Sequence, residues 1–155
     1  MNGLRHIVFI LIIGFAFADI CDDEIACNTG SEGPCVYAEE GLTCDGTPIG
    51  FVYTQSTAQA FYLFNSVLIN DIEVESNDWV GAFNGDVCVG ARQWDTSVCG
   101  GGVCDLPVMG YNGYPETSGY MNAGDIPTFK IYDTSEDFYY DAIASENFAW
   151  ANFGL

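Results

Sequence analysis

The feature that most constrains the fold is a sixteen-residue stretch, residues 79–94, which reads WVGAFNGDVCVGARQW. Two apolar runs in it flank the pair Asn84-Gly85. An Asn-Gly pair between alternating apolar residues is the strongest short-range signal for a β-hairpin, because a type I′ turn needs a positive φ at both central positions. The sequence therefore predicts a hairpin in the core of a β domain, with its turn centred on Asn84-Gly85.

Short segments rich in β-branched and aromatic residues continue along the chain from Ile49. Clusters of Gly, Asn, Asp and Ser separate them, and no stretch shows a sustained 3.6-residue apolar period with caps. The spacing predicts an all-β fold, a disulfide-stapled β-sandwich or jelly-roll-like domain over residues 49–155. The predicted strands are residues 51–54, 58–68, 79–83, 87–94, 106–109, 128–132, 138–143 and 148–153.

The first eighteen residues have the pattern of a secretory signal peptide. A basic start with Arg5 and His6 precedes an unbroken apolar run over residues 7–13, and Ala16-Phe17-Ala18 supplies a small-x-small cleavage pattern. The alternative is a retained anchor or filament-core helix. The apolar run is shorter than the ~20 residues of a membrane span, and no later stretch is a better candidate. We therefore expect no membrane span in the mature chain.

The charge balance excludes several kinds of partner. Without residues 1–18 the chain keeps two basic residues, Arg92 and Lys130, against 22 acidic ones, so its net charge is −20. Nucleic-acid binding requires clustered Lys or Arg and is excluded, and binding to anionic lipid is disfavoured. In so acidic a chain we expect Arg92 to form a structural salt bridge with a carboxylate.

The chain has seven cysteines, at positions 21, 27, 35, 44, 88, 99 and 104. Behind a signal peptide this density predicts disulfides, an oxidising compartment, and secretion to the extracellular space or cell surface. Residues 19–48 have few apolar side chains, so we expect disulfides of Cys21, Cys27, Cys35 and Cys44 to staple this segment, in any of three connectivities.

The remaining cysteines are 88, 99 and 104. A disulfide between Cys99 and Cys104 would close the loop that holds Gly100-Gly101-Gly102, and the alternative pairs Cys104 with Cys88. Because seven is odd, one thiol is either buried and free or joined to another chain.

Two parts of the sequence resemble modules of secreted proteins from marine and other aquatic bacteria. The strings ACN, CVYAEE and CDG resemble a short cysteine-rich repeat, from which this chain departs by a short loop between Cys27 and Cys35, by Thr29 in place of a tyrosine, and by the absence of the last cysteine. The motif WVGAFNGDVCVGARQW and the residues around it, 58–153, resemble a β-sandwich module of the same proteins. This resemblance implies secretion and a β fold, and that family has no assigned function.

The residues available for catalysis are few. The chain after residue 18 has no histidine and one lysine, and no phosphate-binding glycine loop. Triad, Cys-His and His-metal chemistry therefore lack a necessary residue. We expect no enzymatic activity; the alternative is a hydrolase that uses a pair of carboxylates.

Calcium is the metal that the sequence favours, because Ca²⁺ takes oxygen ligands from acidic loops. Of three acidic clusters, the one around the turn at 133–141 is the best placed, since a turn beside two strands can bring several oxygens together. The predicted ligands are Asp133, Glu136, Asp137 and Asp141, and the alternative is an ordinary polar turn.

The aromatic residues divide into two groups. Tyr111, Tyr114 and Tyr120 lie in a Gly-rich loop, where we expect them to be exposed and to bind a partner or a ligand such as a sugar. The three tryptophans, at 79, 94 and 150, lie at predicted strand positions and are expected in the core.

Together these features favour a secreted, non-catalytic structural protein. A small β domain with an appended stapled segment, exposed loop aromatics and an odd cysteine suits a subunit of an extracellular fibre or surface assembly. Head-to-tail contacts of such a subunit generate a homo-oligomer or filament. The alternative function is a calcium-assisted carbohydrate-binding or adhesive module.

Overall fold

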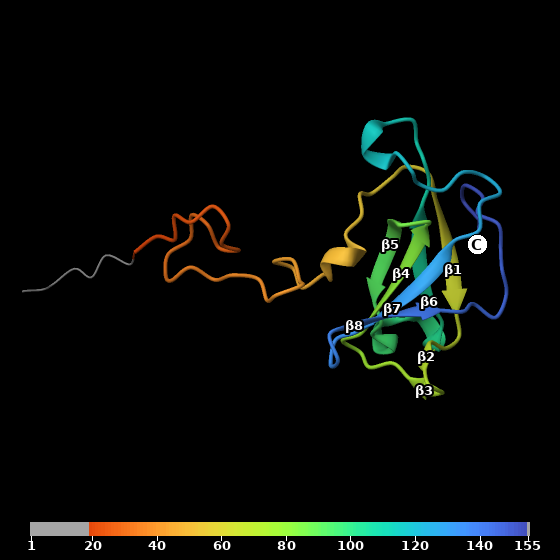
Figure 1. Ribbon diagram of the computed structural model, residues 1–155, viewed down its shortest axis with the longest axis horizontal. Coiled ribbons are helices and arrows are strands. Elements are labelled where there is room, and N and C mark those ends of the chain that lie inside the picture. The colour runs from red at the N-terminus through yellow and green to blue at the C-terminus, as the bar shows by residue number, and fades with distance from the viewer. Residues whose placement is uncertain (1–18, 155) are drawn as a thin grey trace, which may run out of the picture. The chain divides into compact units, whose positions relative to one another are not determined.

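The computed structural model describes residues 19–154. The predicted signal peptide therefore lies outside the described residues. The chain forms two compact units that divide between Ala38 and Glu39, and each is considered by itself. No α-helix occurs in residues 19–154, and the regular elements are strands and single-turn 3₁₀ helices (Figure 1). Within them, no helix has the length and apolarity that a membrane crossing requires.

The first unit, residues 19–38, is held by covalent and hydrogen bonds more than by a core. A disulfide joins Cys21 to Cys35, and a single antiparallel bridge pairs Ile20 with Glu32. The hydroxyl of Thr29 donates to the carbonyl oxygen of Ala26 over 2.7 Å. Only Cys21 and Ala26 of this unit are buried hydrophobic residues. This is the arrangement expected of a segment too small to bury an adequate core.

The second unit, residues 39–154, contains all the named elements. They are η1 (Ile49–Phe51), β1 (Gln59–Phe64), β2 (Leu68–Ile69), β3 (Ile72–Glu73), β4 (Trp79–Asn84), β5 (Val87–Gln93), η2 (Thr96–Val98), η3 (Gly100–Gly102), β6 (Cys104–Met109), η4 (Pro115–Thr117), β7 (Thr128–Asp133) and β8 (Phe138–Ala142). All strand pairs are antiparallel: β1 with β6, β2 with β3, and a four-stranded sheet in the order β5-β4-β7-β8.

The predicted hairpin is present as β4 and β5, but its turn lies one residue further on. Asn84 pairs with Val87, so the two-residue loop is Gly85-Asp86. Gly85 has a φ of 61°, whereas Asp86 is absent from the positive-φ residues. Asn84 stays in the strand, where its side-chain amide donates to the carbonyl oxygen of Gly119 over 3.0 Å. The prediction of a turn with positive φ at both Asn84 and Gly85 is therefore wrong.

A turn with positive φ at both central positions occurs instead between β2 and β3. Asn70 and Asp71 have φ values of 52° and 66°, and Ile69 pairs with Ile72 across them. Two consecutive positive φ values define a type I′ turn, and Asn and Asp tolerate them better than other L-residues. The predicted strand 58–68 is accordingly split into β1 and the first strand of this short hairpin.

The main core lies between β1–β6 and one face of the four-stranded sheet. Leu106 and Val108 of β6 belong to the same buried cluster as Val80 of β4 and Val89 of β5. Two tryptophans, Trp94 and Trp150, are buried in it as expected. The other face of the sheet carries a second, smaller cluster around Phe51, Phe83 and Tyr132, against which Trp79 packs while half-buried.

Two predicted strands are not strands. Phe51 instead ends the 3₁₀ turn η1, which places its ring on the second face of the sheet, and residues 52–54 follow this turn. Residues 148–153 run beside β1 with only isolated bonds, such as that from the Phe153 amide to the carbonyl oxygen of Gln59 over 2.7 Å. Phe153 has a φ of 60°, which breaks the extended conformation.

The remaining cysteines except Cys88 are disulfide-bonded, and both cations of the described residues form ion pairs. Cys99 is joined to Cys104, the pairing expected from the Gly-rich loop between them, and Cys88 is free and buried. Cys27 and Cys44 are also disulfide-bonded. Arg92 pairs with Asp105 of β6, as expected for a structural salt bridge, and the ammonium of Lys130 lies 2.6 Å from a carboxylate oxygen of Asp141.

Candidate functional site

The predicted tyrosine site is only partly at the surface. Tyr111 and Tyr114 are exposed, and the latter is 66% accessible. Tyr120 is 4% accessible and belongs to the main core. Its hydroxyl accepts a hydrogen bond from the backbone amide of Thr54 over 2.6 Å. The expectation that Tyr120 is exposed is wrong, because Met121 beside it forms a bridge with Gly110 and fixes this end of the loop against the core.

The four predicted calcium ligands are not brought together around one point. Asp133 accepts hydrogen bonds from the backbone amides of Ser135 and Glu136, which makes it the cap of the β7–β8 turn. Glu136 accepts from the hydroxyl of Tyr140. Among residues 19–154, no group of three or more His, Cys, Asp or Glu residues is arranged to hold a metal ion. The binding of calcium stays a prediction from the sequence.

The other two predicted ligands also face protein donors. Asp137 accepts from the hydroxyl of Tyr132 over 2.8 Å, and burial together with this bond raises the pKa of Tyr132 to about 12. Asp141 pairs with Lys130 on the second face of the sheet. Both carboxylates therefore have a structural role within the turn and the last strand pair.

The carboxylates with shifted pKa values are held in the ionised form. The hydroxyl of Tyr37 and the amide of Ile25 lower the pKa of Asp23, and hydrogen bonds from Ser97 lower the pKa of Asp95. A glycosidase that uses paired carboxylates needs one of them with a raised pKa, so that it can donate a proton. The pKa values of Asp23 and Asp95 are lowered instead, which is the opposite of what a proton donor needs.

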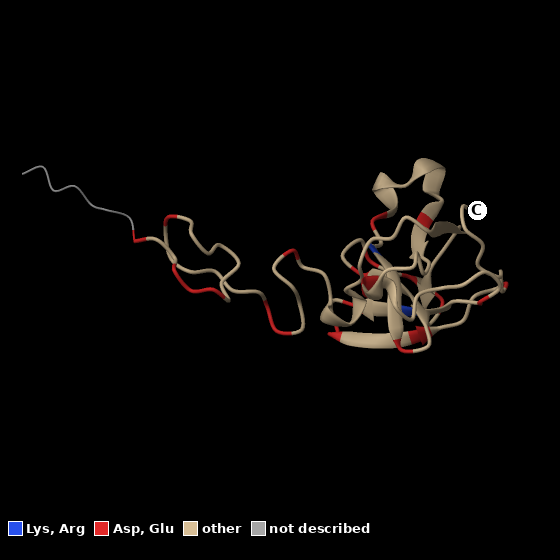
Figure 2. Cartoon of the chain, turned by 90° about the horizontal axis from the view of Figure 1, so that it is seen from above, with Lys and Arg blue, Asp and Glu red and all other residues tan. Residues whose placement is uncertain are grey.

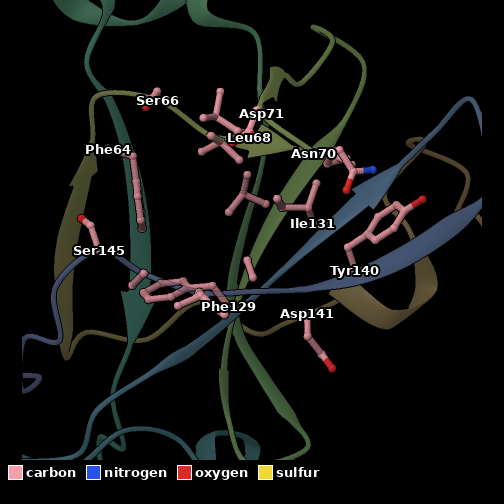
Figure 3. A pocket seen from close by; sticks show the side chains of 16 residues that line it. Phe64, Ser66, Leu68, Asn70, Asp71, Phe129, Ile131, Tyr140, Asp141 and Ser145 are labelled. Carbon is pink, nitrogen blue, oxygen red and sulfur yellow. The ribbon is translucent and has the colours of Figure 1, made fainter.

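A groove beside β8 is a surface feature that the sequence did not predict. It has a volume of about 510 Å³ and lies between the last strand and the β2–β3 hairpin (Figure 3). Its floor is apolar and consists of the buried side chains Val80, Phe129 and Ile131. Asp141 points away from the groove (Figure 3), because it pairs with Lys130 on the other face.

The strand that borders this groove has an unpaired edge. β8 pairs with β7 on one side, and no other strand of the described chain pairs with it. Among residues 19–154, no backbone hydrogen bond outside the sheet involves residues 138–143. The outward amide and carbonyl groups of β8 are consequently open to an added strand. Ile143, which follows the strand at the rim of the groove, is 99% accessible.

Sequence reasoning missed this groove because it depends on strand order. Phe129 and Ile131 have the apolar character of ordinary core residues, and only the position of β8 at the edge of the sheet makes the surface above them open. The exposed aromatic and aliphatic side chains of Phe138 and Ile143 are the one local signal for an open edge.

The chain matches no family model, and no curated protein or solved structure resembles it significantly. The resemblance to modules of aquatic bacterial proteins therefore stays a prediction from the sequence.

Proposed function

We propose that the protein is a secreted, non-catalytic structural subunit of an extracellular fibre or surface assembly. In this proposal residues 39–154 are a disulfide-stapled β-sandwich of jelly-roll-like architecture. The unit formed by residues 19–38 of one copy docks into the groove beside β8 of the next copy. The observation that carries the proposal is the coincidence of an unpaired strand edge with a groove of apolar floor along it.

Strand addition explains why these two features would occur together. An extended segment that pairs with the open edge of β8 satisfies its outward backbone groups. In an extended segment every second side chain faces the same way. Such side chains would cover Phe129 and Ile131 on the floor of the groove. Backbone pairing and apolar burial would then stabilise the same contact.

The first unit supplies a suitable donor. Its side chains Ile20, Ile25, Val36 and Tyr37 are all exposed, although the unit has only twenty described residues. An apolar surface on so small a unit is typical of a site that binds another surface. Because donor and acceptor are different surfaces of one chain, the contact is heterologous, and repetition generates a filament when the rotation does not close.

Secretion is supported by the oxidised cysteines. Six of the seven are disulfide-bonded, and such bonds form and persist mainly outside the cytosol. The signal-peptide pattern of residues 1–18 points to the same compartment.

Two single substitutions test the proposal. Ile143→Lys places a charge at the rim of the groove, and Ile25→Asp places one on the donor surface; both residues are exposed, so folding should be unaffected. In negative-stain microscopy and analytical ultracentrifugation of the mature chain, wild type should form filaments and each variant alone should remain monomeric. A mixture of the two should stop at dimers, because only one intact contact can form. Val98→Lys, at an exposed apolar residue outside both surfaces, is the control and should assemble like wild type.

The opposite results would remove the proposal. Uniform wild-type monomers at high concentration would show that no assembly occurs. Filaments of Ile143→Lys indistinguishable from those of wild type would show that assembly does not use the groove beside β8.

A further inference from the structure

A second hollow lies on the other face of the four-stranded sheet, within residues 39–154. It has a volume of about 580 Å³. Trp79 of β4 and Ala91 of β5 line it from the sheet, and the turn from Thr43 to Thr47 lines another side. The remaining wall is the segment that follows η1, which includes Tyr53 and Gln55. This volume is within the range of about 300–1,000 Å³ that is usual for small-molecule sites.

Small residues in the sheet create the depth of this hollow. Gly81 pairs with Ala91 across β4 and β5, so neither strand carries a large side chain at this point. The ring of Phe51 occupies the space above Gly81, and a Cβ atom on that glycine would lie 2.9 Å from the ring. Phe51 is fully buried and makes edge contacts with Phe83 and Tyr139. The base of the hollow is therefore fixed by packing.

Two aromatic side chains reach this hollow without being buried. Trp79 and Tyr53 are half-buried, and both pack against the second cluster while lining the hollow. Trp94 and Trp150, by contrast, are buried in the main core. The face of an aromatic ring is negative and attracts polarised C–H groups. A pyranose ring presents such C–H groups on its apolar face.

Polar acceptors stand beside the aromatic rings. One carboxylate oxygen of Asp45 accepts from the Thr43 hydroxyl and from the Thr47 amide. These bonds lower the pKa of Asp45, the Thr43 bond most, and hold it ionised. The amide nitrogen of Gln55 donates to the Tyr53 hydroxyl over 3.2 Å. Asp45 and Gln55 are both exposed, and a carboxylate and an amide oxygen each have several lone pairs that can accept hydrogen bonds from a ligand.

The charge of the molecule restricts the ligand further. With 22 acidic and two basic residues after position 18, and both cations already in ion pairs, an anionic ligand would be repelled. A ligand that offers several hydroxyl donors, an apolar C–H face and no negative charge fits every group in the hollow. These are the properties of a neutral saccharide.

We propose that the hollow lined by Trp79, Tyr53, Gln55 and Asp45 is a binding site for a neutral oligosaccharide. A sugar ring stacks on Trp79, and its hydroxyls donate to Gln55 and Asp45. The site is on the opposite face of the sheet from the groove beside β8. It does not depend on assembly, and it differs from the tyrosine loop that the sequence suggested.

Titration calorimetry with four probes tests this site: cellohexaose, mannohexaose, xylohexaose and chitohexaose. The mature chain should bind at least one of them and show a change in tryptophan fluorescence, because Trp79 is half-buried and lines the site. Trp79→Ala and Gln55→Ala should each weaken binding at least tenfold. Tyr114→Ala removes an exposed aromatic ring from the tyrosine loop and should bind like wild type. Ile143→Lys should also bind like wild type, which separates sugar binding from assembly.

Three outcomes would overturn the proposal. The first is the absence of binding to all four probes at millimolar concentration. The second is unchanged affinity in Gln55→Ala, which alters an exposed side chain and stays informative if Trp79→Ala does not fold. The third is loss of binding in Tyr114→Ala with full binding in Trp79→Ala, which would place the sugar on the tyrosine loop.

Discussion

Gly90 lies at a close approach between β5 and β6, two strands of different sheets. A Cβ atom at this position would lie 1.8 Å from the carbonyl oxygen of Pro107 in β6. The same pair of strands is joined by the salt bridge from Arg92 to Asp105. A side chain at position 90 would therefore separate β5 from β6 and open the main core.

Gly90→Ala is expected to lower the free energy of unfolding by about 3 kcal/mol, at the upper end of the range for overpacking. The clash is with backbone, which cannot rotate away. Urea unfolding measures the change. Gly100→Ala is the matched control, because no atom lies within 4 Å of its added Cβ and its φ is not positive. Equal stabilities of the two variants would contradict the close approach.

Cys88 gives a second test at the scale of one residue. Burial raises the pKa of its thiol to about 11, from an ordinary value of 9.0. Between these pH values the unfolded chain releases the thiol proton and the folded chain keeps it, so stability falls as pH rises through this range. Between pH 8 and pH 10 the expected loss is about 1.4 kcal/mol.

Urea unfolding at pH 8, 9 and 10 measures this loss, and Cys88→Ala should remove it. Tyrosines whose pKa is raised by burial, such as Tyr53 and Tyr62, also lower the stability as pH approaches 10. The contribution of Cys88 is therefore the difference in slope between wild type and Cys88→Ala, in which the tyrosines are unchanged. An identical slope in wild type and Cys88→Ala would show that the thiol is not the group responsible.

At the scale of secondary-structure elements, the sequence predicts local pairing better than it predicts long-range order. The hairpin of β4 and β5 is predicted by alternating apolar residues around a glycine, and all of these residues lie within one stretch of sixteen. The position of its turn was wrong by one residue, because Asn84 bonds to Gly119, far away in sequence. The open edge of β8 depends on the pairing of β7 with β4, which no local pattern specifies.

The same distinction explains the outcome at the candidate sites. Tyr111, Tyr114 and Tyr120 have similar glycine-rich neighbours, but only Tyr120 meets the backbone of Thr54 and becomes part of the core. Trp79 was expected in the core and is instead half-buried, because it lines the open hollow together with the small residue Ala91. Whether an aromatic side chain is exposed depends on which residues pack against it, and those residues come from other segments of the chain.

The first unit should depend on its disulfide far more than the second unit does. Only Cys21 and Ala26 are buried within residues 19–38, so little hydrophobic burial opposes the conformational entropy of this segment. Replacing Cys21 and Cys35 together by Ser should unfold residues 19–38, because loss of a disulfide from so small a segment removes about 3 kcal/mol.

Two-dimensional NMR tests this expectation. Amide resonances of residues 19–38 should move to random-coil positions in the double variant, while those of residues 59–142 keep their native dispersion. The matched control replaces Cys99 and Cys104 by Ser, which removes a disulfide from the second unit and should leave that unit folded on its large core. Retention of native shifts by residues 19–38 would show that other bonds hold the unit.

The whole molecule combines an assembly surface with a charge that opposes assembly. Acidic residues occur in both units (Figure 2), while the two cations of residues 19–154 lie on the strands β5 and β7. The proposed donor and acceptor surfaces therefore belong to strongly like-charged bodies. For copies to assemble, the free energy gained from apolar burial and strand pairing has to exceed this electrostatic repulsion. The strength of the repulsion depends on the ionic strength of the solvent.

Filament formation should accordingly increase with salt concentration. The Debye length falls from about 30 Å at 0.01 M to about 8 Å at 0.15 M ionic strength, so repulsion between copies with a net charge of −20 each weakens steeply over this range. Sedimentation of the mature chain in 10 mM and 150 mM NaCl measures the polymerised fraction, which should be larger at 150 mM. CaCl₂ at matched ionic strength is the comparison: it should act as NaCl does if screening alone is responsible, and a larger polymerised fraction would indicate that calcium binds. A polymerised fraction that falls with salt would mean that attraction between charges holds the copies together, and would contradict an apolar contact at β8.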